Sequence, residues 1–204
     1  MVLSAKVDGL PSVYADNPSG IFSAMDWLYT QGHRRFGFLG GSMAFYDAQQ
    51  RLHAFRQYLQ EHDLPYHPEW IAEGDFTAAG AVKGAKVILS GSERLTAILA
   101  VNDETAAGVL QTAQELGIPV PEELSVVGFD DTPFAQVVSP RLSTIHQPLE
   151  QMATTAVALL MQWIEQWTPP ERKEHPLSVE LVLRESTAPA FSSLHHYHKE
   201  ATQP

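Results

Sequence analysis

The sequence contains no cysteine. The chain therefore cannot form disulfides, bind zinc through sulfur or use thiol catalysis, although this absence does not identify the cell compartment. The first residues, MVLSAKVDGLPSVYADN, do not combine the basic start, apolar centre and small-residue end of a signal peptide. No apolar run reaches the length of a membrane span. Together these absences predict a soluble cytoplasmic protein.

Basic residues are also scarce, since 13 Lys and Arg stand against 24 Asp and Glu, a formal charge of -11. Such a surface repels phosphate backbones, and no basic groove or recognition helix is evident. We expect this chain alone not to bind nucleic acid. The sequence also lacks the G-x-S-x-G, P-loop, G-x-G-x-x-G and H-E-x-x-H motifs, which argues against the enzymes that use them.

What the sequence does contain is a regular alternation of short apolar runs and segments with helical spacing of apolar residues. This alternation predicts an α/β fold in which helices cover both faces of a parallel sheet. The expected strands are residues 11–15, 35–39, 70–72, 95–101, 125–129, 141–145 and 177–183. The expected helices begin near Asn17, Ala48, Asp75, Asp103 and Gln151. Within the third helix, we expect Gly80 and Gly84 to allow close packing.

Ligands of open parallel sheets bind beyond the carboxyl ends of the strands. Polar or aromatic residues follow the expected strands at these ends: Asp16, Asn17, Ser42, Asp47, Arg51, Asp75, Phe76, Asn102, Asp103, Asp130 and Asp131. Carboxylates and amides bind hydroxyls, a guanidinium spans two neighbouring oxygens, and an aromatic ring covers the apolar face of a sugar. The set fits a polyhydroxylated ligand.

Each of these residues also has a structural interpretation. Asp16, Asp75, Asp103 and Asp131 could cap helices, and for Asp103 we prefer that role. Arg51 could be a solvated helix residue, and Phe76 could belong to the core. The functional interpretation rests on the number of such groups at one edge of one sheet.

Several motifs of the sequence resemble those of a known protein family. The run ILAVNDETAAGVLQTAQELGIPVPEELSVVGFDDTPFAQVVSPRLSTIHQP is similar to the central signature of the lactose-repressor (LacI/GalR) family of bacterial transcription regulators. The pieces YADNPSG, GHRRFGFLGG, EGDF and LVLREST agree, so the resemblance extends from Leu10 to Thr187. It implies a periplasmic-binding-protein-like (type I) fold. Two Rossmann-like lobes with parallel sheets are then joined by three crossovers, with a small effector in the cleft.

The resemblance also implies roles for individual residues. Arg51 matches the arginine that grips ligand hydroxyls, Asn102 and Asp130 match an amide and a carboxylate of the second lobe, and Phe76 matches the stacking aromatic. Asp47 falls where a polar contact is usual, and Asp16 falls at the rim of the first lobe.

The same resemblance suggests a division into lobes. Residues 1–31 and 149–175 are expected to be the remnant of an incomplete first lobe, and residues 33–145 and 177–186 the second lobe. Crossovers are expected near residues 31–33, 145–148 and 176–179, and residues 189–204 as a disordered tail. A helix-turn-helix head is not present before Leu10, so we expect a fragment whose first strand lacks neighbours.

The leading functional hypothesis is the sugar-binding and dimerisation domain of a transcriptional repressor, without catalysis, cofactor or metal. Its expected partners are a mono- or disaccharide and a second copy of the chain. The dimer is expected to form through surfaces of the second lobe, including the exposed side of the 104–116 helix with Ala106, Ala107 and Leu110. Operator DNA is expected to bind only through the missing head, and no membrane is expected as a partner. The alternative is a periplasmic sugar-binding protein of an ABC transporter.

An enzyme forms a third class of function. A glycosidase using Asp130 and Asp131 ranks low because neighbours on one segment cannot easily flank a glycosidic bond. His195, His196 and His198 could bind a metal, although we favour a flexible tail.

Overall fold

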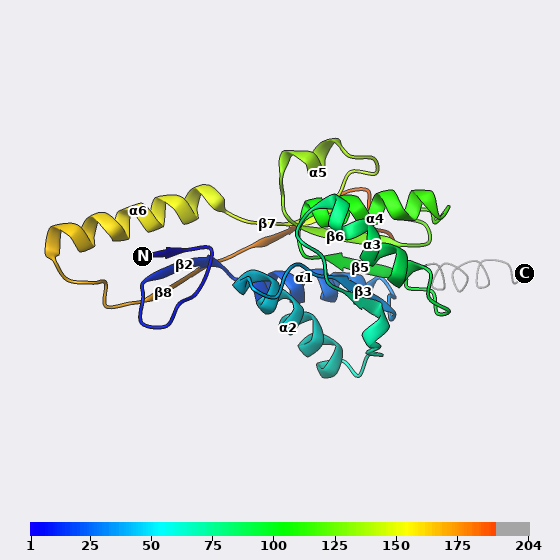
Figure 1. The fold of residues 1–204 in the computed structure, drawn as a ribbon, viewed down its shortest axis with the longest axis horizontal. Helices are drawn as coiled ribbons and strands as arrows, with labels where there is room; N and C mark the ends of the chain where they lie inside the picture. The colour runs from blue at the N-terminus through cyan, green and yellow to red at the C-terminus, as the bar shows by residue number, and fades with distance from the viewer. Residues whose placement is uncertain (191–204) are drawn as a thin grey trace, which may run out of the picture.

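The computed structural model describes residues 1–190, which form two sheets joined by three segments (Figure 1). The large sheet has the order β4-β3-β5-β6-β7-β9, and only β9 runs antiparallel to its neighbour. Its strands are β3 Phe36–Leu39, β4 Ile71–Ala72, β5 Ala97–Ala100, β6 Ser125–Asp130, β7 Ser143–His146 and β9 Glu180–Val182. The small sheet is parallel and consists of β1 Val2–Leu3, β2 Ser12–Ala15 and β8 Glu174–Leu177.

Helices cover both faces of the large sheet, in agreement with the expected α/β class. On one face lie α1 Asn17–Thr30 and α2 Tyr46–Glu61, and on the other lie α3 Ala78–Leu89 and α4 Asp103–Glu115 (Figure 1). The short helix α5 Pro133–Val137 follows β6, a 3-10 helix Pro68–Trp70 precedes β4, and α6 Leu149–Gln166 packs on the small sheet. No helix within residues 1–190 combines the length and apolarity that a bilayer crossing requires.

The fully apolar strand β5 shows why both faces are covered. Ala97 and Leu99 belong to the core under α1 and α2, whereas Ile98 and Ala100 belong to the core under α3 and α4. Successive side chains of a strand point to opposite faces, so a strand buried on both sides must be apolar throughout. Gly84 packs as expected, because a Cβ there would lie 2.7 Å from Leu39 Cδ1.

The position of α1 corrects the expected division into lobes. Ile21, Met25 and Leu28 of α1 share a core with Phe36 and Phe129 of the large sheet. The chain therefore leaves the small sheet at residues 16–17 and not at 31–33, because the apolar stripe of α1 packs on the large sheet beside α2. The chain crosses again at residues 147–148 and at 178–179.

Two other strand expectations also change. The single strand expected at 177–183 is two strands, β8 and β9, in different sheets, since the third crossing interrupts it. The strand expected at 11–15 does have neighbours, because β2 pairs with β1 on one side and β8 on the other.

On the small sheet, α6 buries Met152 and Ala156 but leaves an apolar face exposed. That face consists of Val157, Leu160, Met161, Ile164 and Trp167.

The end of the described chain is packed. The backbone N–H of Ala190 donates to the Gln31 carbonyl, and Ala190 is buried. Residues 189 and 190 are thus part of the fold, which corrects the expected start of the tail. Residues 191–204, with His195, His196 and His198, lie outside the described part of the chain.

Candidate functional site

A cavity of about 300 Å³ opens at the carboxyl end of the large sheet, a size at the lower end of ligand sites. Its lining residues are Phe45, Asp47, Arg51, Phe76, Asn102, Asp130 and Gln147. Five of the six residues singled out from the sequence therefore lie together, although they come from α2, the loop before α3, the start of α4 and the end of β6. The sixth, Asp16, lies outside the cavity and caps α1 by accepting from the Ser19 N–H at 3.2 Å.

Arg51 is the centre of the cavity's charge. Its side chain is only 2% exposed, so the alternative of a solvated helix residue is wrong. Its Nε donates to Asn17 Oδ1 at 2.7 Å and its Nη1 to the Val101 carbonyl at 2.5 Å. The guanidinium also lies 3.5 Å from the centre of the Phe129 ring. Burial lowers the pKa of Arg51, and the nearby carboxylates oppose that shift.

Two carboxylates flank this guanidinium. Asp130 Oδ1 lies 3.7 Å from Arg51 Nη1, and Asp47 Oδ2 lies 3.9 Å from Arg51 Nη2. Asp47 also sits in the first turn of α2, where the helix dipole favours a negative charge. Burial raises the pKa of Asp130 to about 6, against the opposing effects of Arg51 and the Gln147 hydrogen bond. Asp130 has a φ of +112°, a strained conformation of the kind that functional sites often hold.

Asp103 and Asp131 do not line the cavity. The helix cap of α4 is Asn102, whose Oδ1 accepts from the Thr105 N–H at 2.9 Å, so the preferred role for Asp103 is wrong. Asp103 is instead fully buried and accepts from the Thr132 N–H and from the hydroxyls of Thr132 and Thr144. Its carboxylate thereby holds the turn that follows Asp130.

Asp131 is occupied by other partners. It accepts from Arg184 Nη2 at 2.5 Å and contacts His146 Nδ1 at 3.0 Å. Asp130 and Asp131 both border a further cavity beside the second crossing. A paired catalytic use of the two carboxylates still has no support in this geometry, because Asp131 is held by Arg184 and His146 and Asp130 is held by Gln147.

Phe76 forms one wall of the cavity from a loop with a φ of +68°. Its ring meets that of Phe45 edge to face, with 5.4 Å between centroids. A Cβ on Gly41 would lie 2.5 Å from the Phe76 ring, so this glycine makes room for the aromatic. Asn102 Nδ2 donates to the Phe76 carbonyl at 3.2 Å and fixes the loop. The neighbouring Asp75, expected to begin α3, accepts from Thr77, which is the actual cap.

The sequence reasoning missed Phe45 and Gln147. Gln147 follows β7 by one residue, so the strand-end rule that selected the other residues would also have found it. Phe45 lies directly before α2 and has no polar group, and only its contact with Phe76 reveals it.

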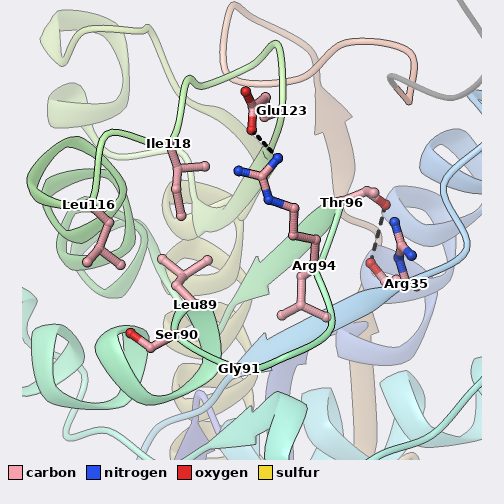
Figure 2. A pocket seen from close by; sticks show the side chains of 10 residues that line it. Arg35, Leu89, Ser90, Gly91, Arg94, Thr96, Leu116, Ile118 and Glu123 are labelled. Carbon is pink, nitrogen blue, oxygen red and sulfur yellow. Dashed lines mark hydrogen bonds and ion pairs between the residues drawn. The ribbon is translucent and has the colours of Figure 1, made fainter.

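A second cavity, of about 450 Å³, lies near the start of β5 and the ends of α3 and α4 (Figure 2). Figure 2 shows Arg94 pointing to Glu123, and their charged atoms lie 2.8 Å apart. Its apolar wall includes Leu89, Leu116 and Ile118. The carboxyl-end cavity is the stronger candidate, because its charged groups are buried and it lies where open sheets bind ligands.

The fold and the cavity define a class of protein: a binding domain with two sheets, three crossings and a polar cavity beside them. The family described as a periplasmic binding protein-like domain matches residues 25–187, and the chain belongs to that family. Within it, the chain is the effector-binding domain of a LacI-family transcriptional regulator. The expected family and the fold class are thereby confirmed.

Three relatives illustrate the match. The HTH-type transcriptional repressor PurR of Yersinia pestis (strain Pestoides F) is 34% identical over 189 residues, covering 91% of this chain and 54% of the relative. The transcriptional regulator CelR–cellobiose complex is 29% identical with a TM-score of 0.82, covering 87% of this chain and 54% of that one. The lac repressor dimer bound to operator and the anti-inducer ONPF is 28% identical with a TM-score of 0.83, covering 91% and 64%. The chain spans about half the length of the curated relatives that it matches.

Proposed function

We propose that the chain binds a mono- or disaccharide in the carboxyl-end cavity and that this binding regulates a repressor. The observation that carries the proposal is the convergence of Asp47, Arg51, Phe76, Asn102 and Asp130 on one cavity. Four separate elements supply these residues, and they meet at the edge of the sheet where open parallel sheets bind ligands.

The chemistry of the cavity favours a neutral polyhydroxylated ligand. Asp47 and Asp130 accept hydrogen bonds from hydroxyls, and Arg51 donates to neighbouring oxygens. Phe76 offers an apolar face for the carbon side of a sugar ring. A phosphate fits less well, because two carboxylates lie within 4 Å of the only cavity-lining cation. A related regulator has been solved with cellobiose.

The cavity lies beside two of the three crossings, so a ligand there can favour one orientation of the two sheets. We propose that DNA-binding heads outside this chain respond to that orientation, in a cytoplasmic protein. The curated relative compared above is a transcriptional repressor, which favours this role over transport.

We also propose a homodimer, through a surface that differs from the one expected. Ala106 and Leu110 of α4 are 0% and 7% exposed and belong to the chain's own core, so they are not available to a partner. The exposed apolar residues beside α4 are Phe134 and Val137 of α5, which are 38% and 79% exposed. Ala107 and Phe134 line one open cavity beside α4. Val137, three residues further along α5, extends the exposed apolar surface that a second copy can cover.

The ligand class is tested by calorimetric titration of the 204-residue chain with glucose, galactose, ribose and cellobiose, and with adenine as a flat, non-sugar probe. We expect one of the sugars to bind and adenine not to bind. Binding of adenine without any sugar would show that the ligand class is wrong.

A further inference from the structure

The two carboxylates of the cavity are each held by an amide from a crossing segment. Asn17 Nδ2 donates to Asp47 Oδ1 at 2.8 Å, and Gln147 Nε2 donates to Asp130 Oδ1. Asn17 lies at the first crossing, and Gln147 lies in the second. Both amides are buried, with Asn17 0% and Gln147 8% exposed.

Asn17 uses both ends of its amide. While Nδ2 donates to Asp47, Oδ1 accepts from Arg51 Nε at 2.7 Å. An amide alone among small side chains offers a donor and an acceptor at this spacing. Asn17 therefore fixes Arg51 and Asp47 relative to each other, although it does not itself line the cavity.

Asn17 also stands where the small sheet ends. The backbone N–H of the preceding residue, Asp16, still donates to the Leu177 carbonyl of β8 at 2.8 Å. One residue later, the Asn17 side chain is bonded to α2 on the large sheet. Figure 1 shows the small sheet with α6 extending to one side of the large sheet, so this junction links the two bodies.

We propose that Asn17 is a positioning residue that couples the ligand-binding pair Asp47 and Arg51 to the first crossing between the sheets. This inference rests on the proposed function, because it assigns a role at the same cavity. A change in ligand contact at Asp47 or Arg51 alters the two hydrogen bonds that Asn17 makes, and Asn17 is joined by one peptide bond to the end of the small sheet's ladder. Ligand affinity therefore depends on a residue that the ligand does not touch.

The test replaces the Asn17 amide by a carboxylate and the Asp47 carboxylate by an amide, singly and together. Asn17→Asp keeps an oxygen for Arg51 but places a second carboxylate against that of Asp47. We expect it to weaken binding of the sugar selected from glucose, galactose, ribose and cellobiose by roughly tenfold or more. In the double variant N17D/D47N an amide again faces a carboxylate, so we expect it to bind more tightly than Asn17→Asp alone. Asp47→Asn completes the cycle and separates any direct contact of Asp47 with the ligand.

A matched control is Asp26→Asn. Asp26 also lies on α1 and accepts a hydrogen bond from α2, from the Tyr58 hydroxyl at 2.8 Å, but it is not part of the cavity. We expect Asp26→Asn to leave sugar affinity unchanged. If it lowers affinity as much as Asn17→Asp does, any weakening of the α1–α2 contact has that effect, and the specific role of Asn17 is overturned.

The possible failures are distinguishable. If the unaltered chain binds a sugar and Asn17→Asp binds it equally well, the inference is wrong and the proposed function stands. If the unaltered chain binds none of the four sugars, the proposed function fails. Urea unfolding of the unaltered chain, Asn17→Asp, Asp47→Asn and N17D/D47N shows whether Asn17 and Asp47 act as a pair. Additive changes in the free energy of unfolding would overturn the proposed link between the two residues.

Discussion

Asp130 is a partly buried carboxyl that the fold makes harder to ionise. Its side chain is 24% exposed, and burial raises its pKa from 3.8 to about 6 despite Arg51 and Gln147. Between these two values the folded state binds a proton that the unfolded state has released. The stability that the neutral form contributes is therefore complete below pH 3.8 and is lost as the pH rises through about 6.

This linkage gives a prediction for Asp130→Asn. Relative to the variant, the unaltered chain should lose free energy of unfolding as the pH rises from about 4 to about 6, and the difference should level off above that range. Urea unfolding at a series of pH values measures it. A difference that does not change over this range would mean that the pKa of Asp130 is not raised.

Sugar affinity should change with pH in the direction opposite to that of stability. The ionised carboxylate accepts hydroxyl hydrogen bonds more strongly than the neutral acid, so binding should strengthen as the pH rises through about 6. Calorimetric titration at pH 5 and pH 8 tests this. Asp130→Asn should remove most of the dependence, and an equal dependence in the variant would assign it to another group.

At the scale of elements, close packing between α3 and the large sheet depends on a glycine. A Cβ at Gly84 would lie 2.7 Å from Leu39 Cδ1 and 2.9 Å from the Ala72 Cβ. We predict that Gly84→Val destabilises the chain by about 1–3 kcal/mol through overpacking. Chemical denaturation checks this, with the exposed neighbour Lys83→Val as control. Equal stability of the two variants would contradict the packing argument.

Most elements were predictable from the sequence because their apolar periodicity matches their burial. The run around β5 is apolar on both faces, and α2 and α4 carry clear buried stripes. Local spacing does not say which sheet an element joins, so it predicted one strand where β8 and β9 lie in different sheets and did not place α1. Both features depend on long-range packing. The family resemblance did place a crossover near residues 176–179, where the chain passes from β8 to β9.

The candidate site was predictable to a similar degree. The strand-end rule found Asp47, Arg51 and Asp130, whose polar character after apolar strands is visible in the sequence. The preferred helix-cap role for Asp103 was wrong, because a buried carboxylate that accepts from Thr132 and Thr144 looks the same in sequence as a helix cap. The role of such a carboxylate depends on hydrogen-bond partners that lie far from it in the sequence.

At the scale of the whole molecule, the α5 surface should determine association. Val137 is 79% exposed beside Phe134. We predict that the chain sediments as a dimer and that Val137→Glu shifts it toward monomer, because a buried charge without a partner is costly. Val87→Glu, at a valine of α3 that is 62% exposed, should leave the dimer intact. A monomer at high concentration before any substitution would refute this surface.

The charge of the molecule gives a further expectation. With a formal charge of -11, this chain alone should show no sequence-specific DNA binding in a gel-shift assay at moderate salt. Nanomolar binding to an operator would contradict it.

The central claim, that the carboxyl-end cavity binds a sugar through Arg51 and Asp130, is tested most directly by one calorimetric series. The sugar that binds the unaltered chain is titrated into Asp130→Ala and Arg51→Lys. Losing the charge-assisted bond of Asp130 should cost roughly 1.5–3 kcal/mol, about a ten- to hundredfold loss of affinity. Arg51→Lys should also weaken binding, since a point charge cannot span two hydroxyls. Unchanged affinity in both variants would show that these residues are structural and that the sugar binds elsewhere.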